Sequence, residues 1–322
     1  MKNILITGSA GFIGFSVSKY FLEKNINVLG IDNLNNYYDK NLKLERLKIL
    51  KTYANYEFLN GDISKKKTFN DIKKKIDLVI NLAAQVGVRF SISKPEEYIK
   101  SNINGFLNVI NFCNKNNIKR IYFASSSSVY GNNKKYPYKE TYSIAKPLQF
   151  YAITKATNEL MAFAYSKLFN IKFTGFRFFT VYGPFGRPDM AIYKFSKNIF
   201  YGSPIEVYGN GQHLRDITYI DDIVTAIYKV VKKDQNNLKE EGYKIFNIGG
   251  GSKIKIIDII RILEKLFNKS TEVIFKDKIS ADMLITESSN HRIEKYIGAL
   301  KRTDPKNGLK KFVNWFLKYE KK

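Results

Sequence analysis

Histidine and cysteine are scarce in this chain of 322 residues. Cys113 is its one cysteine, and His213 and His291 are its two histidines. A single cysteine excludes a disulfide within the chain, and this small set lacks the nitrogen and sulfur ligands of a typical zinc site. We therefore expect no bound metal ion.

Long apolar runs are also missing. No run approaches the ~18 residues that a bilayer-spanning helix needs, and no segment has the pattern of a secretory signal. A glycine-rich turn begins at Gly8, which leaves no room for a targeting peptide before it. We therefore expect a cytoplasmic protein with no membrane partner.

Acidic residues are few beside basic ones. The chain has 29 Asp and Glu against 54 Lys and Arg, a formal net charge of +25, which is compatible with nucleic-acid binding. The basic residues are mostly lysines spread along the chain, and they form no compact patch with arginines and aromatic residues. We interpret them as a solvated coat and expect no nucleic-acid partner, although a positive field would assist capture of an anionic nucleotide.

Apolar runs of strand length alternate with helical patterns through the first half of the chain. This alternation predicts an α/β fold, a doubly wound parallel Rossmann sheet covered by helices on both faces. The expected strands are Asn3–Thr7, Asn27–Ile31, Tyr56–Asn60, Asp77–Leu82, Arg120–Ala124 and Lys172–Phe178, and the expected helices are Phe12–Lys24, Leu42–Tyr53, Asn102–Asn114 and Tyr151–Phe169.

The pattern loosens from about residue 180, where glycine and proline turns become frequent. We expect residues 1–179 to form the NAD-binding Rossmann domain. Residues 217–248 return to it, because Asp221–Lys232 followed by Lys244–Asn247 reads as one more helix and strand. Residues 180–216 and 249–322 are then a smaller, mixed α/β substrate-binding domain.

A strand runs into a glycine turn and a helix near the N-terminus. Gly8, Gly11 and Gly14 allow a tight turn, close approach of the backbone to a pyrophosphate, and close packing of helix on strand. Free amides at the helix start then favour the phosphates. Asp32, at the end of the second strand, is placed to accept the adenosine ribose hydroxyls, which favours NAD over NADP. Asp62 follows the third strand and either contacts the adenine edge or caps a helix.

Tyr151 and Lys155 are four residues apart, so both side chains leave the same face of the expected helix. A neighbouring ammonium favours the phenolate, and we therefore expect a lowered tyrosine pKa and a general base. Ser125–Ser128 follows the fifth strand and should face the same crevice, since ligands bind at the carboxyl ends of parallel strands.

The chain resembles the extended short-chain dehydrogenase/reductase family over nearly its whole length. Within it the chain looks most like the NAD-dependent nucleotide-sugar 4-epimerases, and among these the UDP-glucuronate 4-epimerases. The motifs that carry the resemblance are Thr7–Gly14, Asp32, Asp62, Asn81–Ala84, Gln85–Arg89, Ser125–Gly131, Tyr151 with Lys155, Val181–Ala191, and Arg215-Asp216 with Tyr219–Asp222.

The resemblance implies a hydride shuttle with tightly bound NAD. Tyr151 would remove the proton of the sugar 4-hydroxyl, Lys155 would bind the nicotinamide ribose, and Ser126 would donate a hydrogen bond to the 4-oxygen. The 4-keto intermediate would turn over and take the hydride back on its other face. The implied cofactor-binding residues are Gly8, Gly11, Phe12, Ile13, Gly14, Asp32, Asn33, Asp62, Ile63, Leu82, Ala83, Ala84, Asn102, Tyr151 and Lys155.

A UDP-sugar is the implied substrate, with Arg215 on its diphosphate and Thr180 and Val207 also in contact. For a substrate carboxylate the candidates are Arg89, Arg187, Ser127 and Ser128. Two alternatives stay open, since Arg89 also fits a cofactor-side or interface residue and Arg187 a loop ion pair. The resemblance further implies a homodimer formed by the helices that begin near Asn102 and Tyr151.

Rival functions remain. UDP-glucose, UDP-N-acetylglucosamine or its uronic acid are alternative substrates for a 4-epimerase. A 4,6-dehydratase or a uronate decarboxylase would carry acidic residues where Ser127 and Ser128 stand. The Ser126, Tyr151 and Lys155 set argues against a non-catalytic NAD-binding protein, and the lack of a basic aromatic patch argues against an RNA-binding one.

Overall fold

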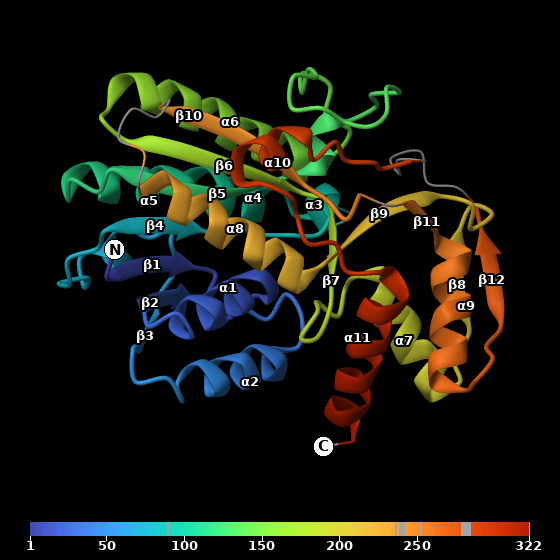
Figure 1. The fold of residues 1–322 in the computed structure, drawn as a ribbon. Coiled ribbons are helices and arrows are strands. Elements are labelled where there is room, and N and C mark those ends of the chain that lie inside the picture. Colours follow the sequence, from blue (N-terminus) through green and yellow to red (C-terminus); the bar gives the residue numbers. More distant parts are fainter. Residues whose placement is uncertain (89, 236, 238–241, 252, 278–284, 322) are drawn as a thin grey trace.

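A seven-stranded sheet forms the centre of the computed structural model, which describes all residues except 89, 236, 238–241, 252, 278–284 and 322. Its strand order is β10-β6-β5-β4-β1-β2-β3, and all six neighbouring pairs are parallel (Figure 1). The predicted Rossmann fold is therefore confirmed. The strands are β1 Asn3–Thr7, β2 Asn27–Asp32, β3 Tyr56–Asn60, β4 Leu78–Asn81, β5 Arg120–Ser126, β6 Lys172–Phe178 and β10 Tyr243–Ile248.

Helices cover both faces of this sheet, because its strands are apolar on both sides. In β1, Ile4 and Ile6 belong to one core cluster while Leu5, between them, belongs to another, as alternating side chains of a strand require. The first cluster includes residues of α1 Phe12–Leu22, α2 Lys40–Leu50 and α8 Ile220–Gln235. The second includes residues of α5 Gly105–Lys115 and α6 Phe150–Leu168.

The helix expected at Asn102–Asn114 is the one whose shape differs most from the prediction. Here α4 Pro95–Tyr98 runs into a π-helical segment, η2 Ile99–Asn104, which continues as α5. The short helix α3 Phe90–Ser93 precedes it. Single-turn π segments are rare and often accompany functional sites, and no side-chain pattern in the sequence announced this one.

The remaining elements gather beyond the carboxyl ends of the large sheet (Figure 1). One small sheet contains β7 Thr180–Tyr182, β9 Leu214–Tyr219 and β11 Lys253–Lys255, and another pairs β8 Ile205–Tyr208 with β12 Val273–Lys276. The helices here are α7 Ala191–Tyr201, α9 Ile256–Phe267 and α11 Pro305–Glu320, whereas α10 His291–Ile297 packs against α8 and β10 of the large sheet. β10 pairs with β6 at the edge of the large sheet. The domain limits that we drew at residues 179, 216 and 248 stay a prediction.

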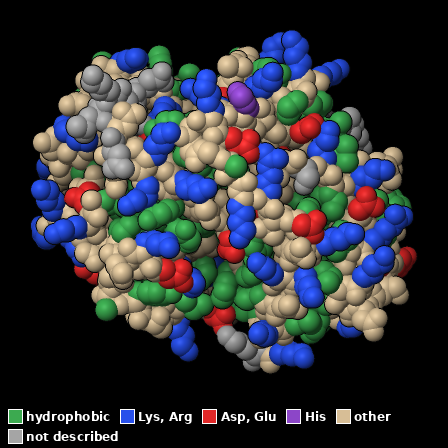
Figure 2. Space-filling model, in the orientation of Figure 1, with side chains coloured by type: hydrophobic (Ala, Val, Ile, Leu, Met, Phe, Trp, Pro, Cys, Tyr) green, Lys and Arg blue, Asp and Glu red, His purple; other side chains and the backbone are tan. Residues whose placement is uncertain are grey.

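Among the described residues, no helix combines the length and apolarity that crossing a bilayer would take. Figure 2 shows Lys and Arg side chains scattered over one face of the molecule, with acidic side chains between them, rather than gathered in a stripe. This distribution agrees with the interpretation of the lysines as a coat, and the absence of a nucleic-acid partner stays a prediction.

A buried ion pair joins α6 to the large sheet. Arg177 on β6 donates from Nε and Nη2 to the two carboxylate oxygens of Glu159 on α6, at 2.9 and 2.7 Å, and both side chains are almost fully buried. Ser125 at the end of β5 donates its hydroxyl to the same carboxylate. The Arg177 guanidinium also lies 4.8 Å from the centre of the Tyr130 ring. The Glu159 carboxylate thus fixes α6 against β5 and β6.

Replacing one partner of this pair should destabilise the fold, because the other charge would stay buried without compensation. We expect Arg177→Met to lower the free energy of unfolding by about 3–5 kcal/mol, measured by urea denaturation. Arg261→Met, which removes the partner of Asp258 in an exposed pair, is the matched control and should cost less than about 1 kcal/mol. Equal effects of the two substitutions would contradict a stabilising role for the buried pair.

Candidate active site

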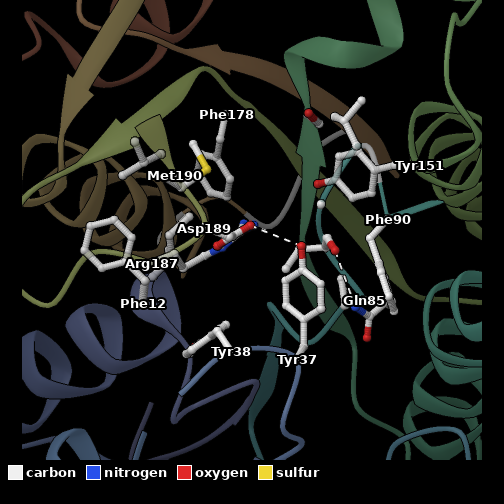
Figure 3. Close-up of a pocket in the computed structure, with 18 of the residues that line it drawn as sticks. Phe12, Tyr37, Tyr38, Gln85, Phe90, Tyr151, Phe178, Arg187, Asp189 and Met190 are labelled. Carbon is white, nitrogen blue, oxygen red and sulfur yellow. Dashed lines mark hydrogen bonds and ion pairs between the residues drawn. The ribbon is translucent and has the colours of Figure 1, made fainter. Parts of the chain in front are cut away.

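A cavity of about 1110 Å³ lies at the carboxyl ends of the large sheet's strands and continues between β7, β8, β9 and α7 (Figure 3). This volume exceeds that of most small-molecule pockets. It is lined by every described residue that the sequence predicted for the site, with the exception of Asn102. These are Gly8, Gly11, Phe12, Ile13, Gly14, Asp32, Asn33, Asp62, Ile63, Leu82, Ala83, Ala84, Ser126, Ser127, Ser128, Tyr151, Lys155, Thr180, Arg187, Val207 and Arg215.

The glycine turn places the start of α1 at the wall of the cavity. Gly8 has φ +71°, a left-handed conformation that favours glycine, and its amide donates to Ile31 O at 2.7 Å. A Cβ on Gly14 would lie 2.0 Å from Gly8 O, so only glycine lets the helix approach the turn this closely. The N-cap residue, Gly11, gives the helix no side-chain cap. Its first amides are therefore suited to hold a pyrophosphate.

Asp32 ends β2 at the same wall and is fixed by backbone amides. Its Oδ2 accepts from Ala10 N at 3.2 Å and its Oδ1 from Leu34 N at 2.8 Å. Lys43 of α2 lies beside it, with Nζ 3.9 Å from Oδ1, and is buried. Burial lowers the pKa of Lys43, and the charge of Asp32 opposes this shift. No sequence motif indicated Lys43, because only the fold brings that face of α2 to the end of β2.

Asp62 stabilises a turn rather than capping a helix, and its contact with an adenine edge stays a prediction. Its Oδ1 accepts from Ser64 N at 2.9 Å, which stabilises the turn after β3, and the residue also lines the cavity. Burial favours the neutral carboxyl, but hydrogen bonds from Ser64 and Asn33 hold the pKa of Asp62 below its ordinary value. An ionised acceptor thus stands beside Asp32.

Tyr151 and Lys155 leave the first turns of α6 and face the end of β5. Lys155 Nζ donates to Ala124 O at 2.8 Å and lies 5.9 Å from the centre of the Tyr151 ring. Ser128 donates to Ser126 Oγ from both its amide and its hydroxyl, at 3.2 and 2.9 Å, so the Ser126 hydroxyl can still donate its own proton. The Tyr98 ring meets the edge of the Tyr151 ring, with ring centres 6.2 Å apart.

The expected lowering of the Tyr151 pKa by Lys155 was wrong for the protein alone. Burial raises the pKa of Tyr151, and this effect outweighs the lowering by the charge of Arg187 and by a hydrogen bond with Ser126. Burial also lowers the pKa of Lys155 to about 8. The helical spacing predicted a neighbouring ammonium correctly, but it could not reveal how little water reaches the two groups.

Arg187 forms an ion pair with Asp189, as one of the two interpretations of the sequence expected. Its Nε donates to Asp189 Oδ1 at 3.0 Å and its Nη2 to Oδ2 at 2.5 Å. Tyr37, from the loop after β2, donates to the same Oδ2 at 3.2 Å (Figure 3). Asp189 and Tyr37 both line the cavity, and the sequence indicated a role for neither, although Asp189 belongs to the Val181–Ala191 motif.

One described residue that the sequence predicted, Asn102, stands apart from this arrangement. Asn102, in η2, uses its amide within the protein: Oδ1 accepts from Gln85 N at 2.7 Å, and Nδ2 donates to Gln85 O and Thr154 Oγ1 at 3.1 and 3.0 Å. The structure therefore places it behind the turn that follows β4, supporting Gln85, which does line the cavity. Arg89 lies outside the described residues.

The site as described suits a dinucleotide and a second anionic ligand. The glycine cradle fits a pyrophosphate, Asp32 fits a ribose, and Tyr151 with Ser126 offers a phenol and a hydroxyl where a reacting alcohol would sit. Within the described part of the chain, no three His, Cys, Asp or Glu side chains come together as a metal site would need.

The chain is similar to known proteins over almost its full length. The model of the NAD dependent epimerase/dehydratase family matches residues 4–249. An uncharacterized protein of Methanocaldococcus jannaschii is 47% identical, over 98% of this chain and 96% of that protein. UDP-glucuronate 4-epimerase of Thermodesulfobacterium geofontis is 39% identical, again over 98% and 96%.

Solved structures agree with these relatives. UDP-glucuronic acid 4-epimerase of Bacillus cereus, crystallised with UDP-glucuronic acid and NAD, superimposes with a TM-score of 0.90 at 30% identity, over 98% of this chain and 99% of that one. UDP-glucose 4-epimerase of Thermotoga maritima, crystallised with UDP-glucose, has a TM-score of 0.88 at 27% identity and covers 99% of both chains.

The buried Lys155 makes stability depend on pH in a defined direction. Its folded pKa, about 8, lies below the ordinary value of 10.5, so folding disfavours its charge at and below pH 8, and this cost disappears as pH rises through 10.5. We expect the unfolding free energy of the wild type to gain about 1–3 kcal/mol relative to Lys155→Met over this range.

The measurement is denaturant unfolding of both proteins at several pH values. Lys167→Met, at an exposed position on the same helix, is the control and should follow the wild type at every pH. A constant difference between the wild type and Lys155→Met would contradict a cost of burying the ammonium.

Proposed function

This chain belongs to the NAD dependent epimerase/dehydratase family, as an NAD-dependent UDP-sugar 4-epimerase, and we propose that its substrate is a UDP-hexuronic acid, with UDP-glucuronate and UDP-galacturonate as the two C4 epimers. The observation that carries the proposal is one cavity that holds Tyr151 and Ser126 beside the glycine cradle and that is also lined by an arginine, Arg187.

The protein's own residues move the proton and orient the sugar. Tyr151 takes the proton of the 4-hydroxyl and returns it in the second half-reaction, while Ser126 donates a hydrogen bond to the 4-oxygen. Lys155, held by Ala124 O, would bind the nicotinamide ribose. The chemistry that bound NAD would supply is reversible storage of the C4 hydride, which would be returned to the opposite face of the 4-keto sugar with no net oxidation. The first amides of α1 and Asp32 would hold its pyrophosphate and adenosine ribose.

The diphosphate and the carboxylate are assigned to different ends of the cavity. Arg215 on β9, with Thr180 on β7 and Val207 on β8, lines the end that would receive the uridine diphosphate. Arg187, Ser127 and Ser128 lie near the reacting groups and are suited to a carboxylate at C5, because a guanidinium and hydroxyls donate hydrogen bonds to it. The absence of an acid at Ser127 and Ser128 disfavours the dehydratase and decarboxylase alternatives.

A neutral sugar is the second candidate. Asp189 already pairs with Arg187, and an arginine so engaged is also compatible with UDP-glucose or UDP-N-acetylglucosamine. The substrate comparison below separates these possibilities.

We also propose that the protein is a homodimer. Ile153, Leu160 and Phe163 on α6 are large apolar side chains with exposed fractions of 44%, 64% and 51%. Their spacing places them along one side of the helix, where a second copy of α6 would cover them.

Purified protein without added NAD should interconvert the two C4 epimers of UDP-glucuronate, and should do so more efficiently than those of UDP-glucose or UDP-N-acetylglucosamine. Chromatographic separation of the epimers gives the ratio of kcat/KM values for these substrates. A higher kcat/KM for a neutral sugar would refute the uronate assignment, and no turnover of any UDP-hexose by protein with confirmed bound NAD would refute the activity.

Tyr151→Phe is the control for this assay. It should lose turnover by roughly 10²–10⁴-fold, since a general base contributes about that much, while it retains NAD measured by absorbance of the released cofactor.

Arg187→Ala should impair uronates selectively. Charged hydrogen bonds contribute about 1.5–3 kcal/mol, so kcat/KM for UDP-glucuronate should fall roughly 10- to 100-fold, while the value for UDP-glucose should change little. The measurement is kcat/KM for both substrates with the wild type and the variant. Equal losses for both would show that Arg187 acts on the fold or the cofactor rather than on a carboxylate.

A further inference from the structure

We propose that Asp189 is a positioning residue that holds the Arg187 guanidinium with one edge toward the C5 substituent of the sugar, and thereby sets the selectivity for uronates. This inference rests on the proposed function, and it adds a residue for which the sequence had given no role.

A guanidinium has two edges that bind a carboxylate with two parallel hydrogen bonds, one formed by Nε with Nη2 and the other by Nη1 with Nη2. Asp189 occupies the first edge, through contacts of 3.0 Å from Nε and 2.5 Å from Nη2. The outer edge still presents Nη1 and the second Nη2 proton. Arg187 can therefore bind a second carboxylate while it remains paired with Asp189.

Arg187 lines the same cavity as the reacting groups. The charge of Arg187 acts on the Tyr151 phenol, whose pKa it lowers. Figure 3 shows Arg187 and Asp189 next to each other in the pocket, with Tyr151 facing the same space. A sugar with its 4-hydroxyl at Tyr151 would carry its C5 substituent on the adjacent carbon, inside the cavity that this guanidinium lines.

Asp189 is itself held, and its second partner comes from a distant part of the chain. Tyr37 donates its hydroxyl to Asp189 Oδ2 at 3.2 Å. The Tyr37 hydroxyl fills the space next to Gly87, where a Cβ would lie 2.0 Å from it. The Tyr37 ring also packs against Phe90, with ring centres 5.1 Å apart. Because the carboxylate is tethered from two sides, it orients the arginine rather than following it.

Orientation matters for the chemistry of the intermediate. A 4-keto uronate is a β-keto acid: when the bond from C5 to its carboxylate breaks, the electron pair passes to the C4 carbonyl as an enolate, carbon dioxide leaves, and the enolate then takes up a proton. The bond breaks readily only when it stands perpendicular to the carbonyl plane. A guanidinium held at a fixed angle keeps the carboxylate away from that geometry, whereas a mobile one does not.

The test compares Asp189→Ala and Asp189→Asn with the wild type on UDP-glucuronate and UDP-glucose. We expect Asp189→Ala to lower kcat/KM for UDP-glucuronate about 10- to 100-fold, the loss typical of a misplaced binding group, with UDP-glucose changed by less than about 2-fold. Release of carbon dioxide per turnover should rise. Asp189→Asn keeps one acceptor, so its kcat/KM for UDP-glucuronate should lie between those of the wild type and Asp189→Ala. Tyr37→Phe should lower the same value by a smaller factor.

Asp258→Asn is the matched control, because it breaks an exposed Asp–Arg pair outside the cavity; it should leave both substrates unchanged. A tighter KM for UDP-glucuronate in Asp189→Ala would overturn the proposal, since it would mean that Asp189 competes with the substrate. Equal losses for both substrates would also overturn it, as a purely structural effect. If the wild type is selective for UDP-glucuronate and Asp189→Ala has the same kcat/KM values, this inference alone is overturned. If the wild type turns over no uronate, the proposed function is overturned together with it.

Discussion

Every strand of the large sheet points the same way, and the active site depends on this constraint. Parallel strands end along one edge, so the segments that follow them meet there although they are far apart in the sequence. The glycine turn follows β1, Asp32 ends β2, and the serine run ends β5. The sheet is rigid because it is buried on both faces, and the Glu159–Arg177 pair then fixes α6, with Tyr151 and Lys155, against β5 and β6.

Much of this could be read from the sequence, because the relevant signals are local. A buried parallel strand is a short apolar run, and β1, β3 and β6 have the predicted bounds. The spacing of the glycines reflects contacts within the single turn after β1, where Gly14 approaches the carbonyl of Gly8. The family, the NAD cofactor and the UDP-sugar 4-epimerase activity that the motifs indicated are confirmed. The roles of individual site residues stay predictions.

What could not be predicted depends on tertiary contacts. Lys43 reaches Asp32 only because α2 packs at the end of β2, and Tyr37 reaches Asp189 across more than a hundred residues. Asn102 was predicted to bind the cofactor, yet its side-chain amide supports the backbone of Gln85. The predicted direction of the Tyr151 pKa shift was wrong for a related reason. The spacing of residues reveals a neighbouring charge, but desolvation depends on every element that covers the group.

The strand order has a consequence for synthesis of the chain. β6 ends at Phe178, but the strand that covers its outer edge, β10, begins only at Tyr243. Between the two, the ribosome must produce β7, α7, β8, β9 and α8. Until β10 emerges, the nascent sheet exposes an apolar edge with unsatisfied backbone groups, the kind of surface to which other strands adhere. The interval between β6 and β10 is thus the period in which the newly made protein is most exposed to aggregation, and in which a chaperone has most to protect.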